Sequence, residues 1–188
     1  FDMAVQANKW FRLDGALSVG NWKNTNDPTA TYKEYGNPDA DTTLNVYAKD
    51  LKTGDAPQTQ IALGGTFFPV KGLYLTLNWR HYADFYADWT VESRLDPDDR
   101  AQSWKVPAYS IWDLHIGYRL PMKSSTGIEL FGHVYNLFDN LFIQDAVDNS
   151  QYNAYMGPNG QNSHGASAAE VFMGLPRMFN AGIKITIQ

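Results

Sequence analysis

Apolar and polar residues alternate along several stretches of the chain, which is the pattern of β-strands with one apolar and one polar face. In the last stretch one face carries Phe179, Ala181, Ile183, Ile185 and Ile187, and the other carries Asn180, Gly182, Lys184, Thr186 and Gln188. No helical periodicity of useful length competes with this alternation. The pattern predicts an all-β chain of about seven strands, at residues 1–7, 11–23, 57–68, 73–83, 108–120, 127–138 and 176–188.

The connections between these strands alternate between short and long. The short turns are residues 8–10, 69–72 and 121–126, and the long loops, expected to be structureless, are residues 24–56, 84–107 and 139–175. Long structureless loops are uncommon in compact soluble domains. An outer-membrane β-barrel instead has short turns on one rim and long loops on the other. The alternation therefore favours a segment of a transmembrane antiparallel β-barrel.

Composition narrows the function classes. The chain has 188 residues, enough for one domain or part of one. Its 20 acidic and 15 basic residues give a net charge of −5, which excludes a bulk basic surface for nucleic acid. The aromatic share of 14% excludes a disordered chain. Because the sequence contains no cysteine, disulfide scaffolds and thiolate metal sites are excluded as well.

Charge and aromatic residues follow the same division between strands and loops. The three long loops hold 16 of the 20 acidic residues but only 6 of the 15 basic ones, as expected if they share one side. Aromatic residues gather near strand ends, as in the girdles at lipid interfaces. A soluble β-sandwich shows alternation and terminal aromatics too. The expected strand length of about ten to thirteen residues favours the barrel, since strands of soluble domains usually have about five or six.

Four segments resemble TonB-dependent outer-membrane receptors. They are Trp104-Lys105-Val106-Pro107-Ala108-Tyr109-Ser110-Ile111-Trp112-Asp113-Leu114, Tyr135-Asn136-Leu137-Phe138-Asp139-Asn140, Gly174-Leu175-Pro176-Arg177-Met178-Phe179-Asn180-Ala181-Gly182-Ile183-Lys184 and Gly54-Asp55-Ala56-Pro57-Gln58. The resemblance covers most of the chain from about residue 55 onward. One departure is that the chain ends Ile187-Gln188, where the family's barrels typically end on an aromatic residue.

The resemblance implies a barrel of about 22 strands with a plug in its lumen. Residues 1–188 would be its C-terminal portion, and the plug and the N-terminal strands would lie outside this sequence. The whole protein would act in nutrient uptake across the outer membrane of a Gram-negative cell, carrying a scarce solute such as a siderophore, a glycan or a peptide. The implied partners are outer-membrane lipid and lipopolysaccharide, TonB through the missing N-terminal part, and a surface lipoprotein in glycan-type members. The resemblance implies no cofactor and no nucleic acid.

No enzymatic motif is present in the sequence. It lacks a Gly-x-Ser-x-Gly elbow, a phosphate-binding glycine loop and a His-Glu-x-x-His pair, so we expect no catalytic residue and no enzyme. His115 and His133 fall on the lumen side of neighbouring strands, where a hydrated polar pair is expected rather than a metal site. Ser163-His164 has no oriented acid near it in the sequence. The remaining candidates are interpreted as solvated loop residues, with divalent ions that bridge to lipopolysaccharide as the alternative: Asp96, Asp98, Asp99, Asp145, Asp148 and Asn149.

Aromatic residues above the predicted strands are the candidates for ligand contact. The stretch 82–89 lies just beyond a predicted strand, and its rings could stack on a sugar face or a chelate ring. The first choices are Tyr82, Tyr86 and Trp89, and the second choices are Trp104, Tyr109, Tyr152 and Tyr155. The alternative is that these rings continue the outer aromatic girdle.

Two other functional classes remain open from the sequence. One is a secreted β-sandwich carbohydrate-binding module, which would be a soluble monomer and would need a second sheet to close its apolar core. The other is a small complete outer-membrane protein, which an odd strand count disfavours because bacterial single-chain barrels have even counts. The transported solute is not readable from the residues, because one fold serves many cargoes.

Overall fold

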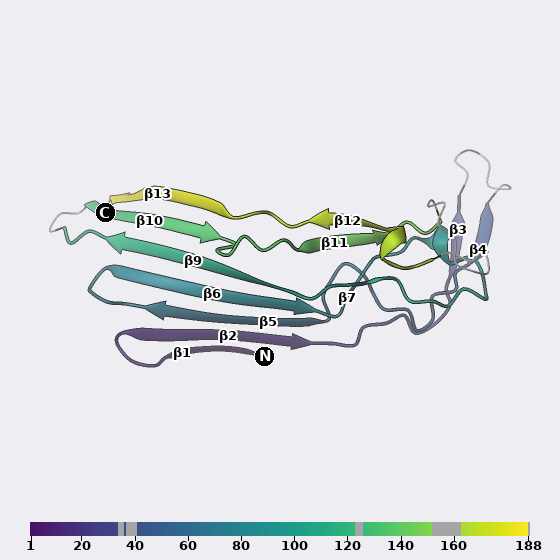
Figure 1. Ribbon diagram of the computed structural model, residues 1–188, viewed down its shortest axis with the longest axis horizontal. Coiled ribbons are helices and arrows are strands. Elements are labelled where there is room, and N and C mark those ends of the chain that lie inside the picture. Colours follow the sequence, from purple (N-terminus) through teal and green to yellow (C-terminus); the bar gives the residue numbers. More distant parts are fainter. Residues whose placement is uncertain (34–35, 37–40, 123–125, 152–162, 188) are drawn as a thin grey trace.

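The computed structural model describes residues 1–33, 36, 41–122, 126–151 and 163–187 and is all-β (Figure 1). Its main element is a seven-stranded antiparallel sheet in the order β1-β2-β5-β6-β9-β10-β13. These strands are β1 (Asp2–Gln6), β2 (Phe11–Val19), β5 (Thr59–Phe67), β6 (Leu73–Ala83), β9 (Tyr109–Arg119), β10 (Thr126–Tyr135) and β13 (Met178–Ile187). The seven predicted strands are confirmed, and their ends differ from the predicted ones by at most four residues. Among the described residues, no helix is long and apolar enough to span a membrane.

Two strands of the sheet end where the backbone takes a left-handed conformation. β10 ends at Tyr135 because Asn136 has a φ of 50°, and β6 ends at Ala83 because Asp84 has a φ of 55°. Asn and Asp tolerate this conformation better than other non-glycine residues. The predicted extension of the sixth main-sheet strand to residue 138 is therefore wrong.

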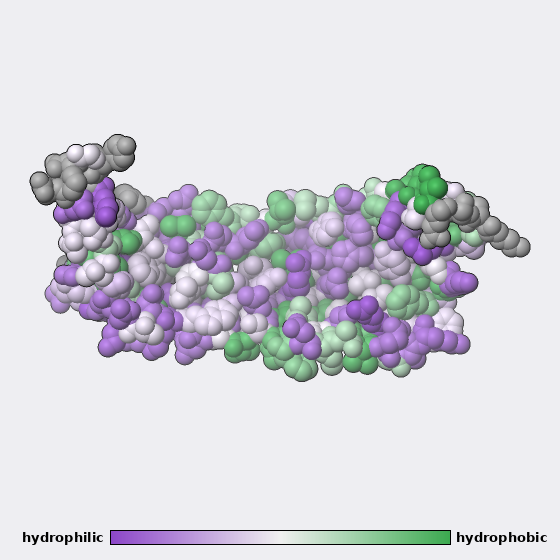
Figure 2. Space-filling model, turned by 180° about the vertical axis from the view of Figure 1, so that it is seen from behind, coloured by the Kyte–Doolittle hydropathy of each residue, from purple (hydrophilic) through white to green (hydrophobic). Residues whose placement is uncertain are grey.

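Strand register gives the sheet two chemically different faces. One row across it joins Leu13, Gly65, Leu77 and Leu114, and the neighbouring row joins Asp14, Gly64, Asn78 and Asp113. On the apolar face, large side chains keep between 40% and 66% of their surface exposed: Leu13, Leu17, Leu63, Leu77, Ile116, Leu130, Ile183 and Ile185. In the view of Figure 2, hydrophilic side chains occupy the middle of the sheet and hydrophobic ones gather along its margins. The described residues thus leave a broad apolar sheet face uncovered.

The long connections all lie at one end of the sheet, and the turns that join β1 to β2, β5 to β6 and β9 to β10 lie at the other (Figure 1). The expectation of structureless loops is wrong, because the loops contain three small two-stranded sheets. These are β3 (Thr29–Tyr32) with β4 (Thr42–Asn45), β7 (Phe85–Tyr86) with β8 (Lys105–Val106), and β11 (Ile143–Asp148) with β12 (Ala169–Met173). Two short 3-10 turns complete this loop layer, η2 (Val91–Arg94) and η3 (Ala166–Ala168).

Two hydrophobic clusters make the loop layer compact. In the first, Trp104 and Ile143 pack on Phe85, Ala87, Val106 and Ala146. In the second, Ala30, Trp89 and Val91 pack on Val46, Ala48 and Leu51. Most fully buried apolar side chains of the described chain therefore belong to the loop layer rather than to a face of the main sheet.

Candidate functional site

A pocket of about 330 Å³ lies at the loop end of the sheet's polar face. Its lining includes Arg80, Tyr82, Tyr109, Tyr135, Phe142 and Leu175. We call it the aromatic pocket. A larger groove of about 640 Å³ shares Arg80, Asp113 and Tyr135 with it and continues along the polar face toward Asp14 and His115. The groove and the aromatic pocket therefore adjoin on the polar face, with the aromatic pocket at the end nearer the long loops.

Three rings form a row in the aromatic pocket. Tyr82 and Tyr109 are direct partners on β6 and β9, and their ring centroids are 5.1 Å apart. Phe142 stacks on Tyr109 at 4.6 Å with an interplanar angle of 26°. Phe142 fits because Gly174 has no side chain, since a Cβ there would lie 2.0 Å from a carbon of the phenyl ring. Cross-strand aromatic pairs of this kind stabilise a sheet and present broad, apolar ring surfaces.

The polar residues of the pocket bond to one another. Arg80 forms an ion pair with Asp113, whose side chain is only 6% exposed. The second oxygen of Asp113 accepts a hydrogen bond of 3.0 Å from the backbone N–H of Asn136. The Asn136 amide in turn donates to the carbonyls of Asn140 and Leu175, at 2.9 and 3.1 Å. Because its charges are paired, the pocket suits a ligand with an uncharged ring or apolar face better than a highly charged one.

The predicted contact between His115 and His133 is confirmed. These residues are partners on β9 and β10, and their Nδ1 atoms lie 2.8 Å apart. The ring of Tyr135 is close to both imidazoles, with centroids 5.7 and 5.9 Å away. Across the part of the chain that the structure describes, no group of three or more His, Cys, Asp or Glu side chains could hold a metal ion.

The structure brings only Tyr82 and Tyr109 of the predicted ligand-contact residues together in this pocket. Tyr86 lies in β7, with the Lys52 ammonium 6.0 Å from its ring centre. Trp89 and Trp104 pack against the two hydrophobic clusters of the loop layer. Tyr152 and Tyr155 lie outside the described residues. The sequence analysis did not identify Phe142 as a pocket residue. The one sequence feature related to its position is Gly174, which leaves room for the Phe142 ring.

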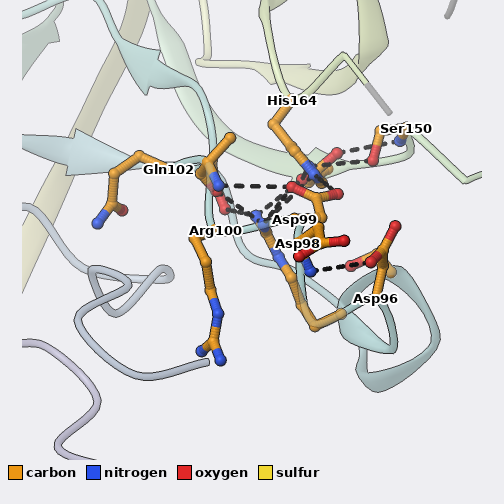
Figure 3. A network of polar contacts seen from close by, with 12 residues as sticks. Asp96, Asp98, Asp99, Arg100, Gln102, Ser150 and His164 are labelled. Carbon is orange, nitrogen blue, oxygen red and sulfur yellow. Dashed lines mark hydrogen bonds and ion pairs between the residues drawn. The ribbon is translucent and has the colours of Figure 1, made fainter. Parts of the chain in front are cut away.

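A second polar assembly lies inside the loop layer, and we call it the His164 cluster: Arg94, Asp99, Asp148, Ser150 and His164. None of these residues is more than 7% exposed. His164 Nε2 lies 2.7 Å from Asp99 Oδ2, and its Nδ1 bonds to Asp148 Oδ2. Figure 3 shows His164 close to both Ser150 and Asp99, whereas Arg100 points away. The Arg94 guanidinium donates to the carbonyl of Ala101 at 2.7 Å and pairs with Asp148 at 3.4 Å.

Burial and pairing shift the pKa values in the His164 cluster. Burial alone would lower the pKa of His164, but its hydrogen bonds to Asp148 and Asp99 outweigh this and raise the pKa above its usual value. Burial would raise the pKa of Asp148, but the hydrogen bond to His164 and those to Ser150 lower it. Burial lowers the pKa of Arg94, against the attraction of Asp148 and Asp99. The protonated imidazole is therefore the form that the cluster stabilises.

Several sequence interpretations are corrected by this cluster. Asp99 and Asp148 are buried and paired rather than solvated, and His164 contacts two oriented acids rather than none. Asp96 and Asp98 are exposed, as predicted. The partners of His164 lie 16 and 65 residues away along the chain, so no local motif could reveal them.

Ser150, His164 and an aspartate together have the composition of a hydrolytic triad, but their geometry does not suit catalysis. The Ser150 hydroxyl lies 3.1 Å from His164 Nδ1, yet that nitrogen also contacts Asp148 and the other contacts Asp99. Ser150 is 2% exposed, so its hydroxyl cannot reach a substrate. The cluster can hold loops together and exchange a proton, and the aromatic pocket can bind a ligand.

Comparison with known proteins found no family model and no curated relative that matches the chain.

Proposed function

We propose that this chain forms part of the wall of an outer-membrane β-barrel transporter of the TonB-dependent type. The observation that carries the proposal is the two-faced sheet, with an uncovered apolar face and a polar, hollowed one. Six of its strands, β1 excepted, have nine to eleven residues, the length that a tilted strand needs to cross a bilayer. In water the apolar face would cost about 25 cal/mol for each Å² left exposed.

The two ends of the sheet fit this orientation. The turns would lie on the periplasmic rim and the loop layer outside the cell. β1 and β13 are the edges of the sheet, and further strands of a longer chain would pair with them, since bare edges invite aggregation. The polar face would line the lumen, and the aromatic pocket would meet a scarce solute just below the extracellular loops. TonB would act through the plug of the whole protein.

The alternative, a secreted β-sandwich binding module, has less support. A sandwich needs a second sheet packed on the apolar face of the first. Within the described ranges, the small sheets lie at the loop end of the main sheet and not on its face (Figure 1). The apolar side chains named above keep two fifths or more of their surface exposed.

Single cysteines test the membrane orientation, because residues 1–188 contain none of their own. The full-length protein without either substitution is the labelling control. Asp98→Cys lies in an exposed loop and Lys71→Cys in an exposed turn at the opposite end. On intact cells that express the full-length protein, a membrane-impermeant maleimide should label Asp98→Cys only. Lys71→Cys should react only after the outer membrane is permeabilised. Labelling of both positions on intact cells, or recovery of the protein in the soluble fraction, would overturn the proposal.

Uptake assays test the role of the aromatic pocket. Tyr82→Ala and Tyr109→Ala remove two rings of the row, whereas Tyr32→Ala removes an exposed ring of β3 as a matched control. Cells would be supplied with a labelled ferric siderophore, an oligosaccharide or cobalamin. We expect the two pocket variants to reduce uptake of whichever solute the wild type imports, at unchanged amounts of protein in the membrane. Uptake equal to that of Tyr32→Ala would remove the pocket from the solute's path.

A further inference from the structure

The hairpin formed by β11 and β12 connects the aromatic pocket to the His164 cluster. At its base, Phe142 and Gln144 line the pocket on the way into the hairpin, and Leu175 lines it on the way out. At its far end, β11 finishes at Asp148, and His164 comes just before the return through η3 and β12. The position of the hairpin therefore fixes one wall of the pocket.

The hairpin contacts residues 84–107 through the first hydrophobic cluster, to which β11 contributes Ile143 and Ala146. Two further kinds of contact hold its far end. Backbone hydrogen bonds join Asp88 N–H to the carbonyl of Ala146 at 2.8 Å and Asp148 N–H to the carbonyl of Asp88 at 2.7 Å. Beside them, Asp148 and His164 from this end pair with Arg94 and Asp99 from the other segment. The buried charges therefore hold the hairpin together with the backbone bonds and the hydrophobic cluster.

The charges of the cluster balance when both carboxylates are ionised and His164 is protonated. The described charged groups that face His164 are Arg94 from η2, Asp99 from the segment after it, and Asp148 from β11. Ser150, which contacts His164, and Ser103, which accepts a hydrogen bond from Arg94, are uncharged. Two carboxylates are neutralised by one guanidinium and one imidazolium. When the imidazole loses its proton, one negative charge stays buried without compensation, which is costly in a dry environment.

We propose that the His164 cluster is a proton-operated latch that holds the β11–β12 hairpin against residues 84–107 and releases it as the pH rises. Release would free Phe142 and Leu175 and so loosen one wall of the aromatic pocket. The latch is a property of the loop layer and does not require that the protein transports a solute.

The direction of the pH dependence follows from His164. Its pKa is raised in the closed latch, because the hydrogen bonds to Asp148 and Asp99 outweigh burial. The contribution of His164 is therefore complete below its ordinary pKa of 6.5 and is lost as the pH rises through the higher value of the closed latch. Asp148 has a lowered pKa, so its contribution is lost only at acidic pH.

Amide hydrogen exchange of the folded full chain, measured from about pH 6 to about pH 9, tests the latch. The reporters are the amides of Asp148 and Asp88, which bond across the latch to the carbonyls of Asp88 and Ala146. After correction for the intrinsic rate, we expect their protection to fall by up to about tenfold per pH unit between the pKa of the open latch and that of the closed one. Protection that stays constant over this range would overturn the proposal, even if the cysteine labelling places the protein in the outer membrane.

Two variants separate the proton from the packing. His164→Gln cannot be protonated, so the protection of Asp148 should be low at every pH. Combining it with Asp99→Asn leaves Arg94 balanced by Asp148, and protection should return without any pH dependence. The control is His81→Gln, because His81 lies on the main sheet and bonds to Ser110. It should keep the wild-type dependence of protection on pH. A pH-dependent profile in the double variant would show that another group operates the hairpin.

Discussion

The main sheet and the loop layer are built on different principles. In the sheet, each strand pairs with the main-sheet strand that precedes or follows it along the chain, and the loops are inserted between them. Side chains alternate between the two faces of the sheet. In the loop layer, the buried charges of the His164 cluster join residues from 16 to 70 positions apart. The comparison teaches that a period of two specifies the sheet, whereas the loop layer depends on a few buried polar groups that are far apart in the sequence.

Charge has different consequences in the two regions. The Arg80 side chain in the sheet is 41% exposed, although its partner Asp113 is buried. Arg94 in the loop layer is fully buried between Asp99 and Asp148. Because water screens exposed charges, losing a charge in the loop layer should have a larger effect than losing one on an exposed surface.

Arg94→Met is expected to have the largest effect. The methionine keeps much of the side-chain volume but leaves two buried carboxylates with only His164 to neutralise them. Removing one partner of a buried ion pair typically costs about 3–5 kcal/mol. We expect that loss in the local stability of the loop layer, measured by hydrogen exchange of the Asp148 amide, with the main sheet unchanged. Arg100→Met, at an exposed ion pair with Asp27, is the control and should leave the loop layer closed. Equal protection in both variants would contradict the comparison.

Leu17→Arg tests whether the stability of the sheet in lipid depends on keeping its apolar face free of charge. Leu17 is 44% exposed on the apolar face, and its neighbour Ser18 lies on the polar face of the same strand. An arginine facing lipid costs about 2–4 kcal/mol at the bilayer midplane and less toward the interfaces. Leu17→Arg should therefore reduce folding stability in lipid vesicles, measured by urea titration, and Ser18→Arg should not. Equal losses at the two positions would exclude a lipid-facing surface.

The sheet and part of the pocket could be predicted from the sequence, and the loop layer could not. Alternation of side chains placed all seven main strands and the His115–His133 contact, because both follow from a period of two and from strand order. β7 and β8 have two residues each, too few to show any period. Phe142 and His164 take their roles from Gly174 and Asp99, which are distant in sequence. Such pairings are set by the fold as a whole.

Gly54→Ala should have a smaller effect than either charge substitution, again confined to the loop layer. A Cβ at Gly54 would lie 2.5 Å from the Cα of Asp88, so the two segments must move apart. Overpacking of this kind costs about 1–3 kcal/mol. Exchange at the Asp88 amide, which bonds to Ala146, would report the loss. Gly65→Ala is the matched control in the sheet, where the nearest atom to the new Cβ would be 4.0 Å away. A larger loss of stability in Gly65→Ala than in Gly54→Ala would contradict the prediction that the loop layer is the more sensitive region.

Lys105→Met addresses the boundary between the two regions and should have the smallest effect. Asp84 follows the end of β6 and accepts hydrogen bonds from Lys105 Nζ at 2.6 Å and from Thr59 Oγ1 at 2.8 Å. These bonds lower the pKa of Asp84, so their contribution to stability is present above its ordinary value of 3.8 and lost as the pH falls through the lower one.

In Lys105→Met the pKa of Asp84 should rise toward 3.8, but not reach it while Thr59 still donates. A carboxyl NMR titration measures this shift, and the unfolding free energy should change by less than about 1 kcal/mol because the pair is largely exposed. Lys71→Met, in a turn far from Asp84, should leave the titration unchanged. If Lys105→Met instead lowered stability as much as Arg94→Met, solvent exposure would not explain why losing a charge has different effects in the two regions.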